Sequence, residues 1–193
     1  MYDYESKINW AVFPGLQGGP HQNAIAAVST ALKEANSEMF KNYAVQVRKN
    51  CQCLAEGLIA KGYDIVSGGT DNHLVLLDLR KAGIDGARVD FVLEQCSITL
   101  NKNSVPGDLK PFVPGGVRIG TAALTSRGLK EKDFETIVDF IDQGVKIALE
   151  LNKLPEAATT VKKFKEACLA ANSPKIAELK QKVEAFALSF PMP

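Results

Sequence analysis

The sequence predicts a mixed α/β fold in which a short-stranded sheet packs against helices, because helical and strand patterns alternate along it. A long helical pattern follows the capping pair Asn36–Ser37 and ends near Gly62. Its apolar residues recur at helical spacing: Phe40, Tyr43, Ala44, Val47, Cys51, Leu54 and Leu58. Short apolar runs bounded by turn formers come next, and three helical patterns close the chain. The strands are too short for a large sheet, so we expect a small sheet covered by helices.

The first 35 residues have a different character. Residues 1–21 are predicted to be irregular, because Val12–His21 holds two prolines and three glycines in ten positions. A helix is predicted from 23 to 35, built of small and aliphatic residues. Since this segment has a helix but no strand of its own, we expect it to complete a structure formed by other residues.

The remaining elements follow from local patterns. Strands are predicted at 63–66, 73–79, 97–100 and 117–120, and helices at 85–95, 132–151 and 160–170, with a last one from Ser173–Pro174 towards 190. A long polar loop is expected from 101 to 116. In the strand at 117–120, the alternation turns Arg118 away from its apolar neighbours.

Composition and charge exclude several classes of protein. The formal net charge is +1, from 23 basic and 22 acidic residues, so no overall field favours nucleic acid or an anionic membrane as partner. No apolar run is long enough to span a bilayer, and residues 1–5 lack a signal-peptide pattern. The four cysteines are expected to be reduced thiols. Cys51 and Cys53 lack the usual ligand spacing, so we predict no metal site.

Two arginines are candidates for binding an anion. Arg118 lies between apolar residues on a predicted strand, where its planar guanidinium needs an acidic partner. That partner is either a ligand carboxylate or an Asp or Glu side chain of the protein. Arg127 suits either the electrostatics of a helix entry or a second anion contact.

Loop residues offer weaker signals. Gly18 and Gly19 precede a predicted helix, where backbone amides suit a phosphate, although most such stretches are simple turns. The amides in Asn101–Ser104 suit a planar heterocycle or, more commonly, a turn. His21 and His73 are isolated and are expected to be structural.

Several segments together resemble the serine hydroxymethyltransferase family, and the resemblance covers essentially the whole chain. The segments are Val12–His21, Ser67–Leu74, Asn101–Asp108, Gly115–Thr121 and Leu124–Gly128. Each is modest alone, but their order and intervals match the family. One departure is Ala122, where the family usually has proline.

The resemblance implies the C-terminal part of a fold-type I transferase that depends on pyridoxal 5'-phosphate (PLP). Residues 1–36 would then be the end of the large PLP-binding domain, and 37–193 the linking helix and the C-terminal small domain. The family interconverts L-serine and glycine and passes the one-carbon unit to tetrahydrofolate. A homo-oligomer, either dimer or tetramer, is implied. So is a cytoplasmic location, with a mitochondrial one as the alternative.

The resemblance also assigns roles to residues. Arg118 matches the arginine that holds the amino-acid carboxylate, and Asn103 an amide of the folate site. Gly18 and Gly19 match a backbone contact to PLP phosphate in the partner subunit of a dimer. Arg127 takes a supporting role.

No lysine of the chain lies in the Thr- and His-containing motif that carries the family's Schiff-base lysine. We therefore expect no catalytic residue in this segment and no turnover by this chain alone. Two alternatives stay open. One is a non-catalytic binding or dimerisation module from the same family, and the other is a plain α/β domain that binds a small anion.

Overall fold

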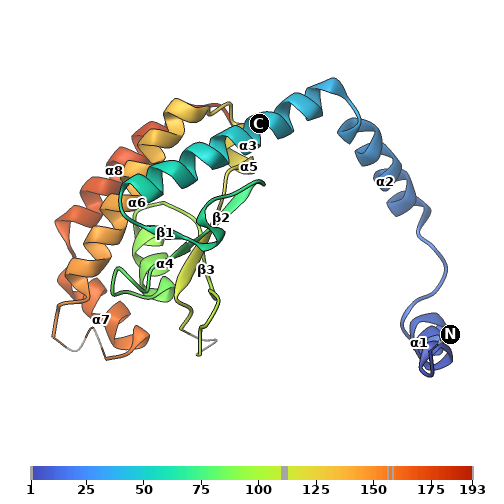
Figure 1. The fold of residues 1–193 in the computed structure, drawn as a ribbon, viewed down its shortest axis with the longest axis horizontal. Coiled ribbons are helices and arrows are strands. Elements are labelled where there is room, and N and C mark those ends of the chain that lie inside the picture. Colours follow the sequence, from blue (N-terminus) through green and yellow to red (C-terminus); the bar gives the residue numbers. More distant parts are fainter. Residues whose placement is uncertain (1, 110–112, 156, 158, 193) are drawn as a thin grey trace. The chain divides into compact units, whose positions relative to one another are not determined.

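The computed structural model describes residues 2–109, 113–155, 157 and 159–192, which form two compact units, 1–42 and 43–193 (Figure 1). The described elements are helices and one four-stranded antiparallel sheet, so the predicted mixed α/β class is confirmed. The boundary between the units falls within a long helix, and the predicted domain boundary after residue 36 stays a prediction.

The first unit is more helical than the sequence suggested. It contains α1 (Glu5–Trp10), a π-helical turn η1 (Ala11–Leu16) and α2 (Gln22–Ala35). The prediction that residues 1–21 are irregular is therefore wrong for 5–16. Residues 5–12 contain neither glycine nor proline, and the backbone leaves helical geometry only at Phe13, just before Pro14.

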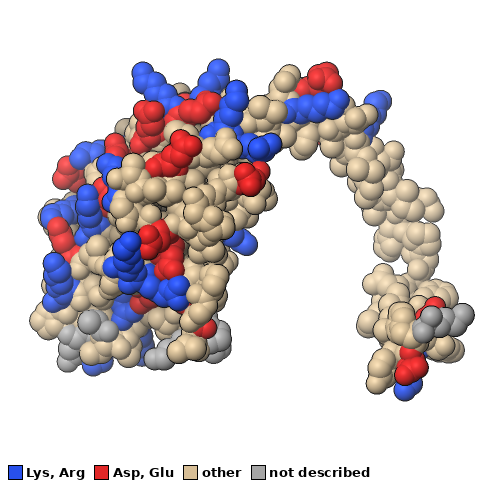
Figure 2. All heavy atoms as spheres, in the orientation of Figure 1, with Lys and Arg blue, Asp and Glu red and all other residues tan. Residues whose placement is uncertain are grey.

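The predicted helix at 23–35 is confirmed as α2. None of the described side chains before residue 37 is buried, and Figure 2 shows few charged residues over this helix.

The long helix α3 (Glu38–Ala60) begins and ends as predicted. The Ser37 hydroxyl accepts a hydrogen bond from the Phe40 amide at 3.2 Å, which caps the N-terminus. At the other end Gly62 adopts a left-handed conformation with φ of 91°. Cys51, Leu54 and Leu58 are fully buried, so the predicted apolar stripe is the face that packs into the core.

The sheet has the strand order β1-β2-β4-β3, with every neighbouring pair antiparallel. The strands are β1 (Asp64–Ile65), β2 (Leu74–Asp78), β3 (Asn101–Asn103) and β4 (Gly116–Gly120). The first, second and last match predicted strands, although the first two are shorter.

The strand predicted at 97–100 is wrong, and so is the start of the loop expected from 101. Ser97 has φ of 60° and lies in a turn, and pairing with β4 begins only at Asn101. The short segment 97–100 resembled a strand, but the position of the partner strand β4 decides where pairing occurs.

Five further helices follow in the described part of the second unit: α4 (Gly86–Gln95), α5 (Ala122–Ser126), α6 (Glu131–Leu151), α7 (Val161–Ala171) and α8 (Pro174–Leu188). Of these, α4 packs against the sheet, and α7 and α8 pack against α4 and α6. All but α5 were predicted. Ala122 is the first residue of α5, a position that proline also accepts.

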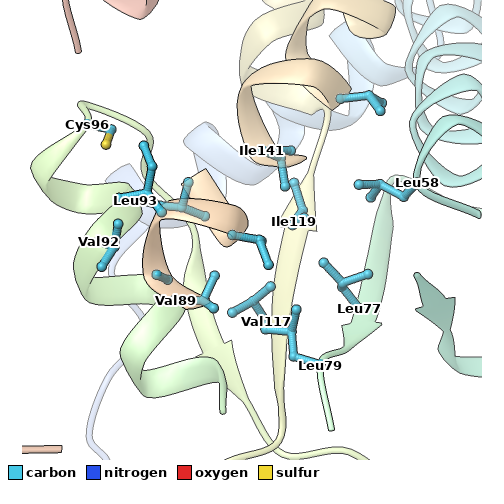
Figure 3. Close-up of a cluster of buried hydrophobic side chains, with 14 of the residues drawn as sticks. Leu58, Leu77, Leu79, Val89, Val92, Leu93, Cys96, Val117, Ile119 and Ile141 are labelled. Carbon is cyan, nitrogen blue, oxygen red and sulfur yellow. The ribbon is translucent and has the colours of Figure 1, made fainter. Parts of the chain in front are cut away.

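The core lies between one face of the sheet and the helices. Figure 3 shows side chains of β2 and β4 gathered with side chains of α3, α4 and α6 and with the residues that follow β2 and α4: Leu58, Leu77, Leu79, Val89, Val92, Leu93, Cys96, Val117, Ile119 and Ile141. Because Val117 and Ile119 point into this cluster, alternate residues of β4 lie on the opposite face. No helix in the described part of the chain is long and apolar enough to cross a membrane.

Candidate functional site

The candidate site lies on the face of the sheet that points away from the core. Arg118, in the middle of β4, is exposed there, whereas its neighbours Val117 and Ile119 are 0% and 8% exposed. Leu76 on β2 and Asn101 on β3 stand directly opposite Arg118. Directly opposed residues share a face, so Arg118 has an aliphatic side chain on one side and an amide on the other.

Arg118 is not paired within the described part of the chain. Every other described arginine except Arg48 has an ion pair or hydrogen bond through its side chain, but no carboxylate of the described residues lies within ion-pair distance of Arg118. Of the two partners considered from sequence, a ligand carboxylate agrees with this geometry better than an internal Asp or Glu. The predicted outward orientation of Arg118 is confirmed.

Asn103 is on the same face, two residues along β3 from Asn101. Its backbone stands opposite Gly116, and its side-chain amide donates a hydrogen bond to the Ser104 carbonyl at 2.8 Å. Its side-chain carbonyl accepts no hydrogen bond from the residues that the structure describes. The structure therefore brings Arg118 and Asn103, but not Arg127, onto one face.

A cluster of charged residues holds the connection between β3 and β4. Asp108 accepts hydrogen bonds from the amides of Val105 (2.9 Å) and Gly115 (2.8 Å), which tie the two ends of this connection together. These bonds lower the pKa of the Asp108 carboxyl. Arg80 lies between Asp108, at 3.6 Å, and Asp78, at 2.6 Å.

Sequence reasoning missed this cluster. The only local signals were the turn at Pro106–Gly107 and the Asp78–Arg80 spacing of two residues along an extended chain. Neither shows that the end of β2 lies beside the β3–β4 connection.

Arg127 donates hydrogen bonds to backbone carbonyls at and just after the C-terminal end of α8. Its Nε donates to the Pro191 carbonyl at 3.0 Å, and its Nη2 to the carbonyls of Ala187 and Phe190. A guanidinium at the last carbonyls of a helix satisfies groups that have no partner within the helix and complements the helix dipole. The structure thus gives Arg127 a packing role, while the anion contact stays a prediction.

The histidines and cysteines form no site in the described segments. His73 is exposed and contributes its backbone carbonyl to the Thr121 amide at 3.0 Å. The four cysteines are free thiols, and burial raises the pKa of Cys96 and of Cys168 to about 11. No three His, Cys, Asp or Glu side chains among the described residues are grouped as metal ligands would be.

Comparison with known proteins identifies the family. A family model described as "Serine hydroxymethyltransferase" matches residues 1–141. The chain belongs to the serine hydroxymethyltransferase family.

The sequence similarity to individual relatives extends over the whole chain. It is 53% identical to "Serine hydroxymethyltransferase" of Bombyx mori, over 100% of this chain and 42% of that protein. It is 50% and 49% identical to the proteins named "Serine hydroxymethyltransferase, cytosolic" of Neurospora crassa and Oryctolagus cuniculus, covering 100% of this chain and 40% of each. The chain thus spans about two fifths of the length of these relatives.

Gly18 and Gly19 suit the phosphate contact that the hydroxymethyltransferase resemblance implies. They lie between η1 and α2, and a side chain added at either would meet nothing within 4 Å. Neither amide has a hydrogen-bond partner among the described residues. Free amides just before the N-terminus of a helix fit an anion such as a phosphate group.

Proposed function

We propose that this chain supplies the substrate-carboxylate site and a folate contact of a PLP-dependent serine hydroxymethyltransferase. The enzyme would interconvert L-serine and glycine and transfer the one-carbon unit to tetrahydrofolate. The observation that carries the proposal is Arg118, an exposed guanidinium in the middle of β4 that forms no ion pair with any of the described residues. Its setting on an otherwise uncharged row, opposite Leu76 and Asn101, suits one carboxylate.

Each residue has a separate task in this proposal. Arg118 donates two parallel N–H bonds to the carboxylate of serine or glycine, which fixes the orientation of the amino acid. Asn103 presents an amide to the heterocycle of tetrahydrofolate, and the amides of Gly18 and Gly19 contact the phosphate of PLP bound in the partner subunit of a dimer. When bound, PLP supplies the electron sink for the chemistry at the α-carbon.

The enzyme is proposed to act as a homo-oligomer, either dimer or tetramer, in the cytoplasm. The names of the N. crassa and O. cuniculus relatives support the cytoplasmic location. None of the chain's lysines has the family's Thr- and His-containing context. We therefore propose that residues outside this sequence attach PLP covalently, so kinetic tests of the proposal require the complete enzyme.

Replacing Arg118 tests the proposal. Arg118→Ala should raise the KM for serine and lower kcat/KM by about 100-fold or more, because a charge-assisted bidentate bond is worth roughly 1.5–3 kcal/mol and orientation is lost as well. Arg118→Lys should recover only part of this loss, since an ammonium lacks the planar fork.

Lys102→Ala is the matched control. Lys102 is an exposed cation on the neighbouring strand, but it stands opposite Val117 and so faces the other way. Steady-state kinetics with near-normal constants for the Arg118→Ala enzyme would exclude the carboxylate role.

Asn103 has its own test. Asn103→Ala should impair the tetrahydrofolate-dependent conversion of serine more than the folate-independent binding of serine to the PLP enzyme, followed by its absorption spectrum. An equal loss in both measurements would exclude a folate contact.

A further inference from the structure

An acidic side chain lies close enough to compete for Arg118. Asp78 ends β2 opposite Gly116, and Leu76, two residues earlier, stands opposite Arg118. Asp78 and Arg118 therefore share one face of the sheet as diagonal neighbours on adjacent strands. Diagonal neighbours in an antiparallel pair are about 7–8 Å apart at Cα, within reach of a side chain as long as arginine.

Asp78 is instead held by Arg80. The Asp78 Oδ2 accepts from Arg80 Nη2 at 2.6 Å, and Oδ1 accepts from Arg80 Nε at 3.0 Å and from the Arg80 amide at 3.0 Å. This two-bond fork uses the carboxylate edge that would otherwise be free to meet Arg118. The Asp78 side chain is 18% exposed and the Arg80 side chain 45%, so the carboxylate is more shielded from water than the guanidinium.

Arg80 is itself held in place from the other side. Its Nη1 lies 3.6 Å from Asp108 Oδ1, and its Cγ lies where a side chain on Gly115 would be, 2.7 Å from the position of an added Cβ. Arg80 is therefore wedged between the end of β2 and the β3–β4 connection.

The other acidic group beside Asp78 has a partner as well. Asp64 stands opposite Asp78 on β1 and pairs with Lys81 at 3.3 Å.

We propose that Arg80 is a positioning residue which keeps Asp78 occupied and so leaves Arg118 available for a carboxylate ligand. This inference rests on the proposed role of Arg118 as the substrate-carboxylate site. It assigns Arg80 no contact with substrate. Without the Arg80 fork, Asp78 Oδ2 turns to Arg118, and substrate binds only to the fraction of molecules in which Arg118 is free.

Kinetics of a rescue series in the complete enzyme test the proposal. Arg80→Gln should raise the KM for serine about 3- to 10-fold, with a smaller change in kcat, because a competing ion pair of ordinary strength occupies Arg118 most of the time. Asp78→Asn alone should leave KM near the wild-type value. The double variant Arg80→Gln/Asp78→Asn should restore KM, because the competitor is gone.

The variant Asp108→Asn distinguishes the proposed role of Arg80, which is to keep Asp78 occupied, from mere structural support of the β3–β4 connection. If Arg80 acts only by holding the β3–β4 connection, Asp108→Asn would reproduce the Arg80→Gln defect and the Asp78→Asn change would not repair it. That pattern would overturn the proposal. Arg80→Lys, which keeps the charge and one bond, is the milder variant should Arg80→Gln fold poorly, and its smaller KM defect should also be repaired by Asp78→Asn.

A measurement on the 193-residue chain tests the pairing without any activity. The pKa of Asp78, followed by carboxyl NMR, should remain low in Arg80→Gln because Arg118 takes the place of Arg80. It should rise when Arg118→Gln is added. If adding Arg118→Gln leaves the pKa of Asp78 unchanged, Asp78 does not pair with Arg118 and the proposal is wrong. If the NMR result holds but serine KM does not respond, the pairing stands and the substrate role of Arg118 fails.

Discussion

At the scale of single residues, a buried amide ties the segment after Arg118 to the rest of the second unit. Asn50, on α3, is 0% exposed, and its Nδ2 donates to Thr125 Oγ1 at 2.8 Å and to the Leu129 carbonyl at 2.9 Å. Thr121, which precedes α5, donates its hydroxyl to the Val47 carbonyl at 3.0 Å. These bonds fix α5, and with it the end of β4, against α3. A buried polar network of this kind is stabilising only when each member is satisfied.

Asn50→Ala should therefore lower the free energy of unfolding by about 1–3 kcal/mol, because the Leu129 carbonyl and the Thr125 hydroxyl lose a buried donor. Gln46→Ala is the matched control. Gln46 bonds to Asn50 at 2.9 Å and to Glu131 at 2.8 Å but is only partly buried, so water can replace it and the loss should be smaller. Urea unfolding measures the free energy of unfolding of both variants. Equal losses in the two variants would show that burial of Asn50 does not make its hydrogen bonds more stabilising than those of Gln46.

At the scale of elements, the β3–β4 connection depends on ionised carboxylates. The Gly115 and Val105 amides lower the pKa of Asp108, and the hydrogen bond from the Arg80 side chain lowers the pKa of Asp78. A carboxyl whose pKa is lower in the folded state contributes stability above its unfolded pKa of about 3.9, and this contribution is lost as the pH falls through the folded value.

The difference in unfolding free energy between the wild type and Asp108→Asn should consequently be constant from pH 7 to about 5 and shrink below about 4. Urea titrations of both proteins at pH 7, 4 and 3 measure this difference in unfolding free energy. Because the other carboxyl groups are the same in both proteins, their contributions to the pH dependence cancel in the difference. A difference that stayed the same down to pH 3 would mean that the charge of Asp108 is unimportant and only its shape matters.

Elements with local signals were predictable, and those that depend on distant partners were not. The caps at Ser37 and Gly62 and the proline that opens α8 each act within a few residues, so α3 and α8 followed from the sequence. In contrast, α5 has five residues and is held by contacts to α3, and β3 exists because β4 lies beside it.

In the candidate site, too, some features follow from local sequence and others depend on distant partners. Alternation along one strand predicted that Arg118 points outwards, whereas its relation to Asp78 depends on the register between β2 and β4. That register cannot be predicted from the residue pattern of either strand alone. The assignment of Arg118 to a carboxylate came from the family resemblance, because the residues alone left an internal ion pair open.

At the scale of the whole molecule, the first unit leaves its apolar residues uncovered. On α2, Ile25, Val28 and Leu32 follow helical spacing and are 51%, 59% and 66% exposed. A continuous apolar stripe on a helix is typical of a surface that packs against protein. The chain corresponds to about two fifths of its relatives, so we propose that other parts of the complete enzyme cover this stripe.

Replacing the three stripe residues by glutamine should have opposite effects in two settings. In the 193-residue chain the triple variant should bind less of the apolar dye anilinonaphthalene sulfonate and self-associate less, with little change in the unfolding of the second unit. In the complete enzyme the same variant should be destabilised, by roughly 1.5–3 kcal/mol for each large side chain that is buried there. Light scattering and thermal unfolding measure the two effects.

The control substitutes the opposite face of the same helix. Asn23→Gln and Glu34→Gln lie about half a turn away from the stripe, so they should alter neither dye binding nor the stability of the complete enzyme. A stripe variant that left the complete enzyme as stable as the control would show that α2 stays exposed there.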